Sequence, residues 1–165
     1  MKKGVNKKFR GFTIIEVTLV LAVAGLIFLM VFVALPGLRA SQRDAERREN
    51  VAIFLESVKK YQNNNRGALP TNWNSFRNDY FKNKSDPSGE NYNLVVVNCG
   101  ANADAECNGS GDITNIYNSS WPNGYKLVVI KQATCRGDRA VGTKNPRKIA
   151  VLNRLEGAGV YCSNT

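Results

Sequence analysis

Residues 12–35, FTIIEVTLVLAVAGLIFLMVFVAL, form a run of 24 residues in which Glu16 is the only strongly polar side chain. An α-helix rises about 1.5 Å per residue, so this run would be about 36 Å long, which is enough to cross a bilayer with some tilt. Between Val17 and Leu35 the run has no charged residue. The run therefore predicts a membrane-spanning helix, around which the rest of the fold has to be arranged.

The eleven residues before this run are polar and basic. They contain no acidic residue and five positive charges, on Lys2, Lys3, Lys7, Lys8 and Arg10. Positive charge beside a membrane helix favours the cytoplasmic side, so we expect the C-terminal part of the chain to lie outside. Without these five residues, the 23 basic residues fall to 18 against 13 acidic ones, and the formal charge falls from +10 to +5.

Two ordinary explanations of such a start have to be weighed. The apolar run of a secretory signal peptide is usually about 7–15 residues long, which is shorter than the run here. The residues that follow it, PGLRA at 36–40, also make a poor signal-peptidase site. An ordinary membrane anchor fits the hydropathy equally well, so hydropathy alone leaves that alternative open.

A second helical segment is predicted directly after the apolar run. We expect Pro36 to kink the helix but not to end it, because a helical pattern resumes. Apolar residues recur there at spacings of three and four, at Val51, Phe54, Leu55, Val58 and Tyr61. We expect the charged face to be a solvated surface, with Arg43, Asp44, Arg47, Arg48, Lys59 and Lys60. The residues 63–67 and Pro70 should end the helix.

The remaining residues are expected to form loops and short strands. Strands are predicted at 92–98, 125–133 and 148–155, with a possible short strand at 160–162. The roughly 100 residues outside the membrane helix suffice for one small domain. A long helix followed by a small antiparallel sheet is an α+β arrangement, in which the sheet should cover the apolar stripe between Val51 and Tyr61.

The cysteine and histidine content limits the chemistry of the chain. The four cysteines, Cys99, Cys107, Cys135 and Cys162, all follow the membrane segment, which favours two disulfides in an oxidising space. A structural zinc site is the alternative, but the chain has no CxxC pair. The sequence contains no His, which excludes Ser-His-Asp triads and HExxH zinc sites. We therefore expect no enzymatic activity, no cofactor and no metal.

The junction between the basic start and the apolar run carries a family resemblance. Residues 8–16, KFRGFTIIE, closely resemble the signature of type IV prepilins and of the related type II secretion and competence pseudopilins. The resemblance implies that residues 1–11 are a leader, which a membrane-embedded aspartyl peptidase removes between Gly11 and Phe12. It also implies N-methylation of Phe12. The mature chain would then have a filament-core helix at 12–35, its amphipathic continuation at 36–66, and a β-rich extracytoplasmic region at 67–165.

The residue types at this junction suit these roles physically. Gly11 has no Cβ to hinder a peptidase. Glu16 places a carboxylate inside an apolar helix, where an unpaired buried charge costs several kcal/mol. Cleavage would free an amine at Phe12, and pairing that amine with Glu16 of a neighbouring subunit would satisfy both charges. The alternative is that Glu16 is an interfacial carboxylate that reaches the headgroups.

The resemblance also bears on the cysteines. Pilins close a variable C-terminal loop with a disulfide, and Cys135 and Cys162 would bracket such a loop. We pair Cys99 with Cys107 on the same reasoning, because each pair brackets a local loop. Three connectivities are compatible with four cysteines, and the sequence leaves all three open.

The predicted function is that of a structural subunit of a type IV pilus-like filament. Its partners would be further copies of itself, the prepilin peptidase and the inner-membrane assembly machinery. We expect a single-pass cytoplasmic membrane protein before assembly and an extracellular or periplasmic filament afterwards. A type II secretion or competence pseudopilin is the first alternative. A membrane-anchored binding protein is the second, and it leaves Gly11, Phe12 and Glu16 unexplained.

Eight basic residues lie between positions 126 and 156, against Asp138 and Glu156. They are compatible with binding to DNA or to an anionic cell surface. The alternative is a solubilising surface at a sheet edge, and no interleaved aromatic residues strengthen the nucleic-acid interpretation. These residues are Lys126, Lys131, Arg136, Arg139, Lys144, Arg147, Lys148 and Arg154.

Overall fold

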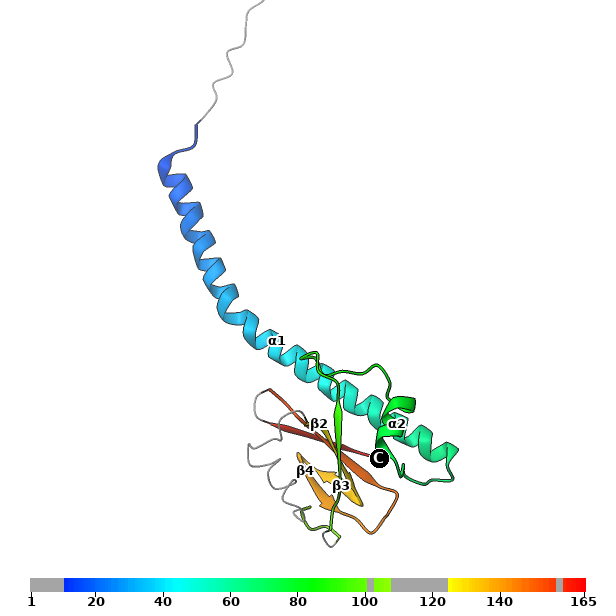
Figure 1. Cartoon of the computed structure of the whole chain (residues 1–165). Coiled ribbons are helices and arrows are strands. Elements are labelled where there is room, and N and C mark those ends of the chain that lie inside the picture. Colours follow the sequence, from blue (N-terminus) through cyan, green and yellow to red (C-terminus); the bar gives the residue numbers. More distant parts are fainter. Residues whose placement is uncertain (1–10, 101–102, 108–124, 157–158) are drawn as a thin grey trace, which may run out of the picture. The chain divides into compact units, whose positions relative to one another are not determined.

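The computed structural model describes residues 11–100, 103–107, 125–156 and 159–165 (Figure 1). The chain forms two compact units, an N-terminal unit up to Arg39 and a C-terminal unit from Ala40 to Thr165. One helix, α1 (Ile14–Asn64), contributes to both units. The amphipathic part of this helix therefore belongs to the same unit as the strands.

Helix α1 is continuous through Pro36, as expected from the helical pattern on both sides of the proline. Its C-terminal end also lies where the sequence predicts it. Gly67 has a φ of +81°, a left-handed conformation that glycine adopts without steric cost, and its N–H donates to the carbonyl oxygen of Gln62 at 2.7 Å. Pro70 follows and prevents the helix from resuming.

The C-terminal unit contains a four-stranded sheet in the order β1-β2-β5-β6. Its strands are β1 (Asn93–Asn98), β2 (Tyr125–Lys131), β5 (Ile149–Arg154) and β6 (Val160–Asn164). The α+β class is confirmed, and strands β2, β5 and β6 pair in antiparallel fashion. However, β1 pairs with β2 in parallel, where a wholly antiparallel sheet was predicted. A parallel pair needs a crossover of a dozen or more residues, and the 26 residues between Asn98 and Tyr125 provide one.

A second helix, α2 (Trp73–Tyr80), lies in a segment that we expected to be loop. The Oδ1 of Asn72 accepts hydrogen bonds from the backbone N–H groups of Asn74 and Ser75, both at 3.1 Å, which is typical of an N-cap. The sequence does contain the signal, because Asn72 precedes aromatic residues at positions 73, 76 and 80. Eight residues are, however, too few for a helix to be stable without tertiary packing.

The predicted strand at 125–133 divides into two elements. Gln132 has a φ of +55°, which ends β2 and turns the chain into β3 (Ala133–Arg136). Strand β3 pairs with β4 (Arg139–Gly142) in a separate two-stranded hairpin, which the sequence analysis did not predict. A positive φ is uncommon at a residue other than Gly, Asn or Asp, so the sequence carries no clear signal for this turn.

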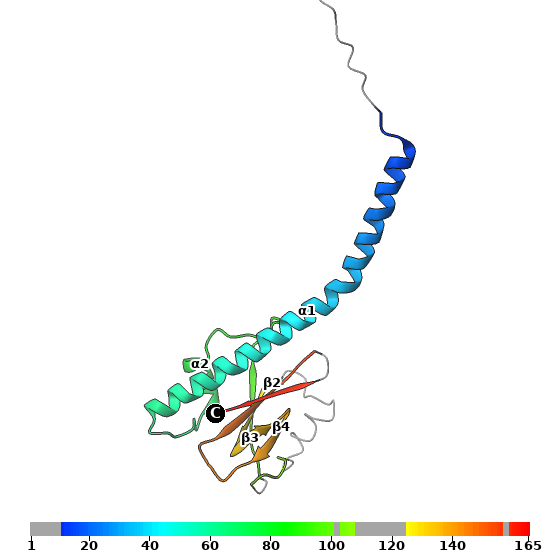
Figure 2. The same ribbon diagram turned by 180° about the vertical axis from the view of Figure 1, so that it is seen from behind.

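The four-stranded sheet has an apolar core on each face. On one face, Val51, Phe54, Leu55 and Val58 of α1 pack against residues of β2 and β5, which confirms the predicted helical stripe. Figure 2 shows the sheet alongside this part of α1 from the opposite side. On the other face, the alternate residues of β2 and β5 pack against the β3–β4 hairpin and the cysteines. Strand β5 is buried along nearly its whole length for this reason.

Both disulfides join the predicted partners. The Cα atoms of Cys99 and Cys107 are 4.8 Å apart, and those of Cys135 and Cys162 are 5.8 Å apart. The first bond closes the segment that follows β1, and the second ties β3 to β6. All four cysteines are used, so none of them is free.

Candidate functional site

The predicted processing junction lies immediately before α1. Gly11, Phe12 and Thr13 precede the first helical residue, and the side chain of Phe12 is 83% exposed. Apart from its chain neighbours, no atom of the described residues lies within 4 Å of a Cβ built on Gly11. Packing against the described residues therefore does not require a glycine at this position.

Glu16 lies in the first turn of α1, where Thr13 acts as the N-terminal cap. The backbone N–H of Glu16 donates to the Oγ1 of Thr13 at 3.3 Å, and the N–H of Val17 donates to the carbonyl oxygen of Thr13 at 3.3 Å. A carboxylate in the first turn is also favoured by the helix dipole. Thr13-Ile14-Ile15-Glu16 fits the sequence pattern of a capping box, which our sequence analysis missed.

The apolar part of α1 has no partner within the described chain. Eighteen large apolar side chains between Phe12 and Leu38 are exposed, by 40% to 84%. Among the residues that the structure describes, α1 is the one helix long and apolar enough to cross a membrane. The hydrophobic effect makes so large an apolar surface unstable in water, so a bilayer or another protein surface has to cover it.

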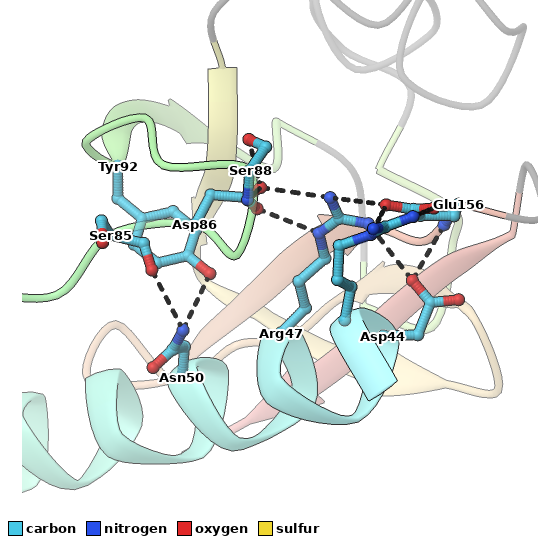
Figure 3. Close-up of polar contacts among 9 residues, drawn as sticks. Asp44, Arg47, Asn50, Ser85, Asp86, Ser88, Tyr92 and Glu156 are labelled. Atoms are coloured by element: carbon cyan, nitrogen blue, oxygen red, sulfur yellow. Dashed lines mark hydrogen bonds and ion pairs between the residues drawn. The ribbon is translucent and has the colours of Figure 1, made fainter. Parts of the chain in front are cut away.

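The C-terminal unit has a polar cluster of its own where α1 meets two loops (Figure 3). Arg47 is only 8% exposed. Its Nε and Nη2 lie 2.9 and 3.1 Å from the two carboxylate oxygens of Asp86, and its Nη1 lies 3.2 Å from Asp44. Glu156 completes the cluster, with one oxygen 3.5 Å from the Nη2 of Arg47. Arg47 is therefore surrounded by three carboxylates.

Further hydrogen bonds connect this cluster to the chain around it. Arg43 donates to both carboxylate oxygens of Glu156, at 2.6 and 2.7 Å. The backbone N–H of Glu156 donates to Asp44 at 2.9 Å. On the other side, the Nδ2 of Asn50 donates to the hydroxyl of Tyr92 at 3.1 Å. These contacts fasten α1 to the 85–92 segment and to the segment after β5.

Ion pairing decides the protonation of the buried carboxylate. Burial alone would raise the pKa of Asp86, but hydrogen bonds from Arg47 and Ser88 outweigh burial and lower that pKa to about 2. The hydrogen bond to Asp86 raises the pKa of Arg47 in turn. Asp86 and Arg47 are therefore both charged at neutral pH.

The prediction that the charged face of α1 is wholly solvated is wrong for Arg47 and incomplete for its neighbours. Periodicity placed Arg47 opposite the apolar stripe, yet Asp86 lies 39 positions away and covers it. Arg48 lies over the ring of Tyr161, with its guanidinium carbon 5.5 Å from the ring centroid. Lys59 and Lys60 are exposed, as expected. The sequence holds no signal for a charge partner so distant along the chain.

The basic residues between positions 126 and 156 do not act as one free patch. Arg136 forms an ion pair with Asp104 at 3.3 Å, and Arg139 forms one with Glu106 at 2.8 Å. Lys144 and Arg147 are exposed, while Lys131, Lys148 and Arg154 are half-buried. The side chain of Lys126 lies outside the described residues. Binding to DNA or to an anionic surface stays a prediction.

A scan against protein-family models found no match, and neither the curated proteins nor the solved structures contained a significant match to this chain.

Proposed function

We propose that this protein is a structural subunit of a type IV pilus-like filament, made as a prepilin and processed between Gly11 and Phe12. The observation that carries the proposal is the apolar part of α1, which starts just after Gly11 and Phe12, contains Glu16 in its first turn, and is left uncovered by the described residues of its own chain. A membrane covers this surface before assembly, and the same surfaces of other copies cover it afterwards.

The position of Glu16 supports polymerisation more than simple anchoring. A simple anchor gains only the local capping and helix-dipole benefit of this carboxylate, while a charge inside an apolar helix is costly. In a bundle of copies, the cationic amine of a mature Phe12 can approach the Glu16 of a neighbour, and the pairing of the two charges would set the axial position of each subunit. Cleavage after Gly11 is needed for this, because it creates the amine.

The location and partners follow from the same proposal. The subunit would cross the cytoplasmic membrane once, with the C-terminal unit and its two disulfides in the oxidising space outside. The prepilin peptidase, an assembly machinery in the inner membrane and further copies of the chain would be its partners. A secretion or competence pseudopilus would use the same subunit chemistry in a shorter filament.

Glu16→Ala tests the proposal in the native host. The variant should be inserted, cleaved and disulfide-bonded, but should form few or no fibres in electron micrographs. The reason is that each Phe12 amine would be buried without a partner, a loss that can reach roughly 3–5 kcal/mol for a fully buried pair. Gly11→Val should instead leave the uncut precursor in the membrane, as N-terminal sequencing would reveal.

Asp138→Ala is the matched control, because it removes an exposed carboxylate of the C-terminal unit. It should leave fibre number unchanged. Normal fibres from Glu16→Ala would contradict the pairing role. A mature wild-type chain that begins at Met1 would contradict processing and favour a membrane-anchored binding protein.

A further inference from the structure

The segment that follows α2 is anchored in the core of the C-terminal unit at both of its ends. Phe81 comes directly after α2, and its side chain is 3% exposed, with its ring centroid 5.2 Å from that of Phe54. Tyr92, just before β1, is 1% exposed. Residues 82–85 follow Phe81 and are exposed. The chain therefore leaves the core after Phe81 and is back in it at Tyr92.

A pocket of about 420 Å³ lies between the C-terminal end of α2 and this segment. We call it the α2 pocket, and its volume is within the usual range of small-molecule sites. Phe81 and Tyr92 contribute to its lining, which otherwise consists of polar and charged residues. The charged residues are three cations and one carboxylate, Arg77, Lys82, Lys84 and Asp79. The α2 pocket therefore carries a net positive charge.

The positive charge of the α2 pocket is not neutralised by the described residues. Among them, Arg77, Lys82 and Lys84 form no ion pair. Arg47 in the same unit is, by contrast, surrounded by carboxylates. Lys82 and Lys84 are exposed, so water solvates them, whereas Arg77 is half-buried and is more costly to leave without an anion. An anionic ligand would supply the missing charge.

Arg77 is held in place by the chain around it. Its Nη1 donates to the carbonyl oxygen of Tyr92 at 3.0 Å, and its Nη2 donates to the Oδ1 of Asn78 at 3.4 Å. A guanidinium group has five N–H donors in one rigid plane, so these two hydrogen bonds leave further donors for a carboxylate. Because the side chain is already positioned, a ligand that binds it loses little affinity to side-chain ordering.

The remaining side chains of the lining narrow the choice of anion. Asn78, Asn83 and Asn91 carry amides, which both donate and accept hydrogen bonds, as the hydroxyl groups of a sugar also do. The carboxylate of Asp79 accepts hydrogen bonds from hydroxyls and repels a ligand rich in phosphate. A peptide would need apolar subsites or a free sheet edge, and Phe81, which lines the pocket, is almost fully buried. A carboxylate surrounded by hydroxyl groups therefore fits the lining best.

We propose that the α2 pocket binds an acidic sugar, a unit that carries one carboxylate among several hydroxyl groups. Arg77 binds the carboxylate, and the asparagines and Asp79 bind the hydroxyls. Lys82 and Lys84 attract the negative charge of the same unit or of the next unit in an acidic polysaccharide. The proposal does not depend on filament formation, because all residues of the α2 pocket belong to the C-terminal unit.

Calorimetric titration of the full-length chain in detergent tests the proposal. The probe is the trimer of galacturonic acid, which should bind with a Kd of about 1 mM or below. The matched ligand is the methyl ester of the same trimer, which keeps the hydroxyl groups and loses the charges. The ester should bind at least about tenfold more weakly than the acid, because the cations of the α2 pocket lose their partner. Equal binding of the two, or no binding of the acid, would overturn the proposal.

Substitutions in the α2 pocket locate the binding site. Arg77→Gln should raise the Kd for the trimer about tenfold, which corresponds to about 1.4 kcal/mol. Near-UV circular dichroism would show whether this variant keeps its fold after losing the hydrogen bonds of the guanidinium group. Lys82→Gln with Lys84→Gln changes only exposed side chains, so it tests the site without that concern, and it should raise the Kd about threefold or more.

Lys59→Gln with Lys60→Gln is the matched control, because it removes the same charge from two exposed lysines of α1 outside the α2 pocket. It should leave the Kd unchanged. A loss of affinity as large as that of the Lys82 and Lys84 variant would mean that the trimer follows the net charge of the chain, and would overturn the proposed site.

Two further probes test the role of the hydroxyl groups. A capped peptide of three glutamates carries carboxylates without hydroxyls, and a DNA trinucleotide carries phosphates. Both should bind at least about fivefold more weakly than the sugar trimer, since the amides of Asn78, Asn83 and Asn91 would lack hydroxyl partners. Equal or tighter binding of the peptide would indicate a protein partner, and equal or tighter binding of the trinucleotide would indicate nucleic acid. Either result would overturn the assignment to an acidic sugar.

Discussion

The apolar side chains of the two parts of α1 differ in their exposure to solvent. From Phe12 to Leu38 every large apolar side chain is exposed, and Leu26, Phe28 and Leu29 are each 66% exposed. After Ala40, Val51, Phe54 and Val58 are fully buried within the C-terminal unit. The polar residues differ in the same way, because Arg47 contacts three carboxylates, whereas Glu16 has no ion pair among the described residues.

This difference indicates where each part finds its stability. The second part of α1 finds its apolar contacts and ion pairs inside the C-terminal unit. Its side chains should therefore determine how stably that unit folds. The first part depends on a bilayer or on other copies, so its side chains should govern insertion and assembly. Unfolding of the C-terminal unit, measured on the full-length chain in detergent, can separate the two parts.

Truncation of a core aromatic residue should have the largest effect. Phe54 contacts the rings of Trp73, Phe76 and Phe81 with centroids 5.2 to 6.4 Å apart, and Phe54→Ala should lower the free energy of unfolding by about 3–5 kcal/mol. Denaturant titration followed by near-UV circular dichroism would measure it. Phe28→Ala is the matched control in the exposed part and should change this value little. Equal losses from both variants would show that the two parts of α1 are not energetically separate.

Removal of the disulfides should have a smaller and graded effect. Loop-closure entropy grows with loop length, so replacing Cys135 and Cys162 with serine should cost about 3.5 kcal/mol, and replacing Cys99 and Cys107 about 2.5 kcal/mol. The sequence separations are 27 and 8 residues. Urea titrations of the two double variants would give the order. A larger loss from the shorter loop would contradict the entropic explanation.

Acid should have the smallest of the three effects. The pKa of Asp86 is about 2 in the folded chain, below its ordinary value of 3.8. The stabilisation from this group is fully present above about pH 4 and is lost as the pH falls towards about 2, to a total of about 2 kcal/mol. Asp86→Asn should flatten the pH dependence of unfolding in that window, and Asp138→Asn, which changes an exposed carboxylate, should not. An unchanged acid profile of Asp86→Asn would contradict the role of the Arg47–Asp86 pair.

Local sequence patterns were sufficient to predict α1 and most of the strands. The spacing of Val51, Phe54, Leu55 and Val58 predicts the buried face of α1, because the period of a helix fixes which residues share a face. The apolar strands after Tyr92 were recognised for a similar reason. The disulfide pairing also agrees with the prediction, although the sequence left two other connectivities open.

Other features depend on contacts between distant residues. The parallel pairing of β1 with β2 and the turn at Gln132 have no strong local signal. Helix α2 has a capping signal at Asn72, but its eight residues need packing against the rest of the unit to be stable. The burial of Arg47 has the same origin, because its partner Asp86 is separated from it along the chain by the C-terminal end of α1 and by α2.

The sequence by itself determined the length and hydrophobicity of the first part of α1, the basic charge before it and the α+β class, and it is the basis of the predicted processing between Gly11 and Phe12. Each of these depends on composition or on short-range spacing, which a single segment carries without reference to the rest of the chain. Only the tertiary structure decided which charges of α1 form ion pairs inside the C-terminal unit and which remain exposed. Ion pairs form between groups that folding brings close in space, and the distance between two charges in space cannot be read from their separation along the chain.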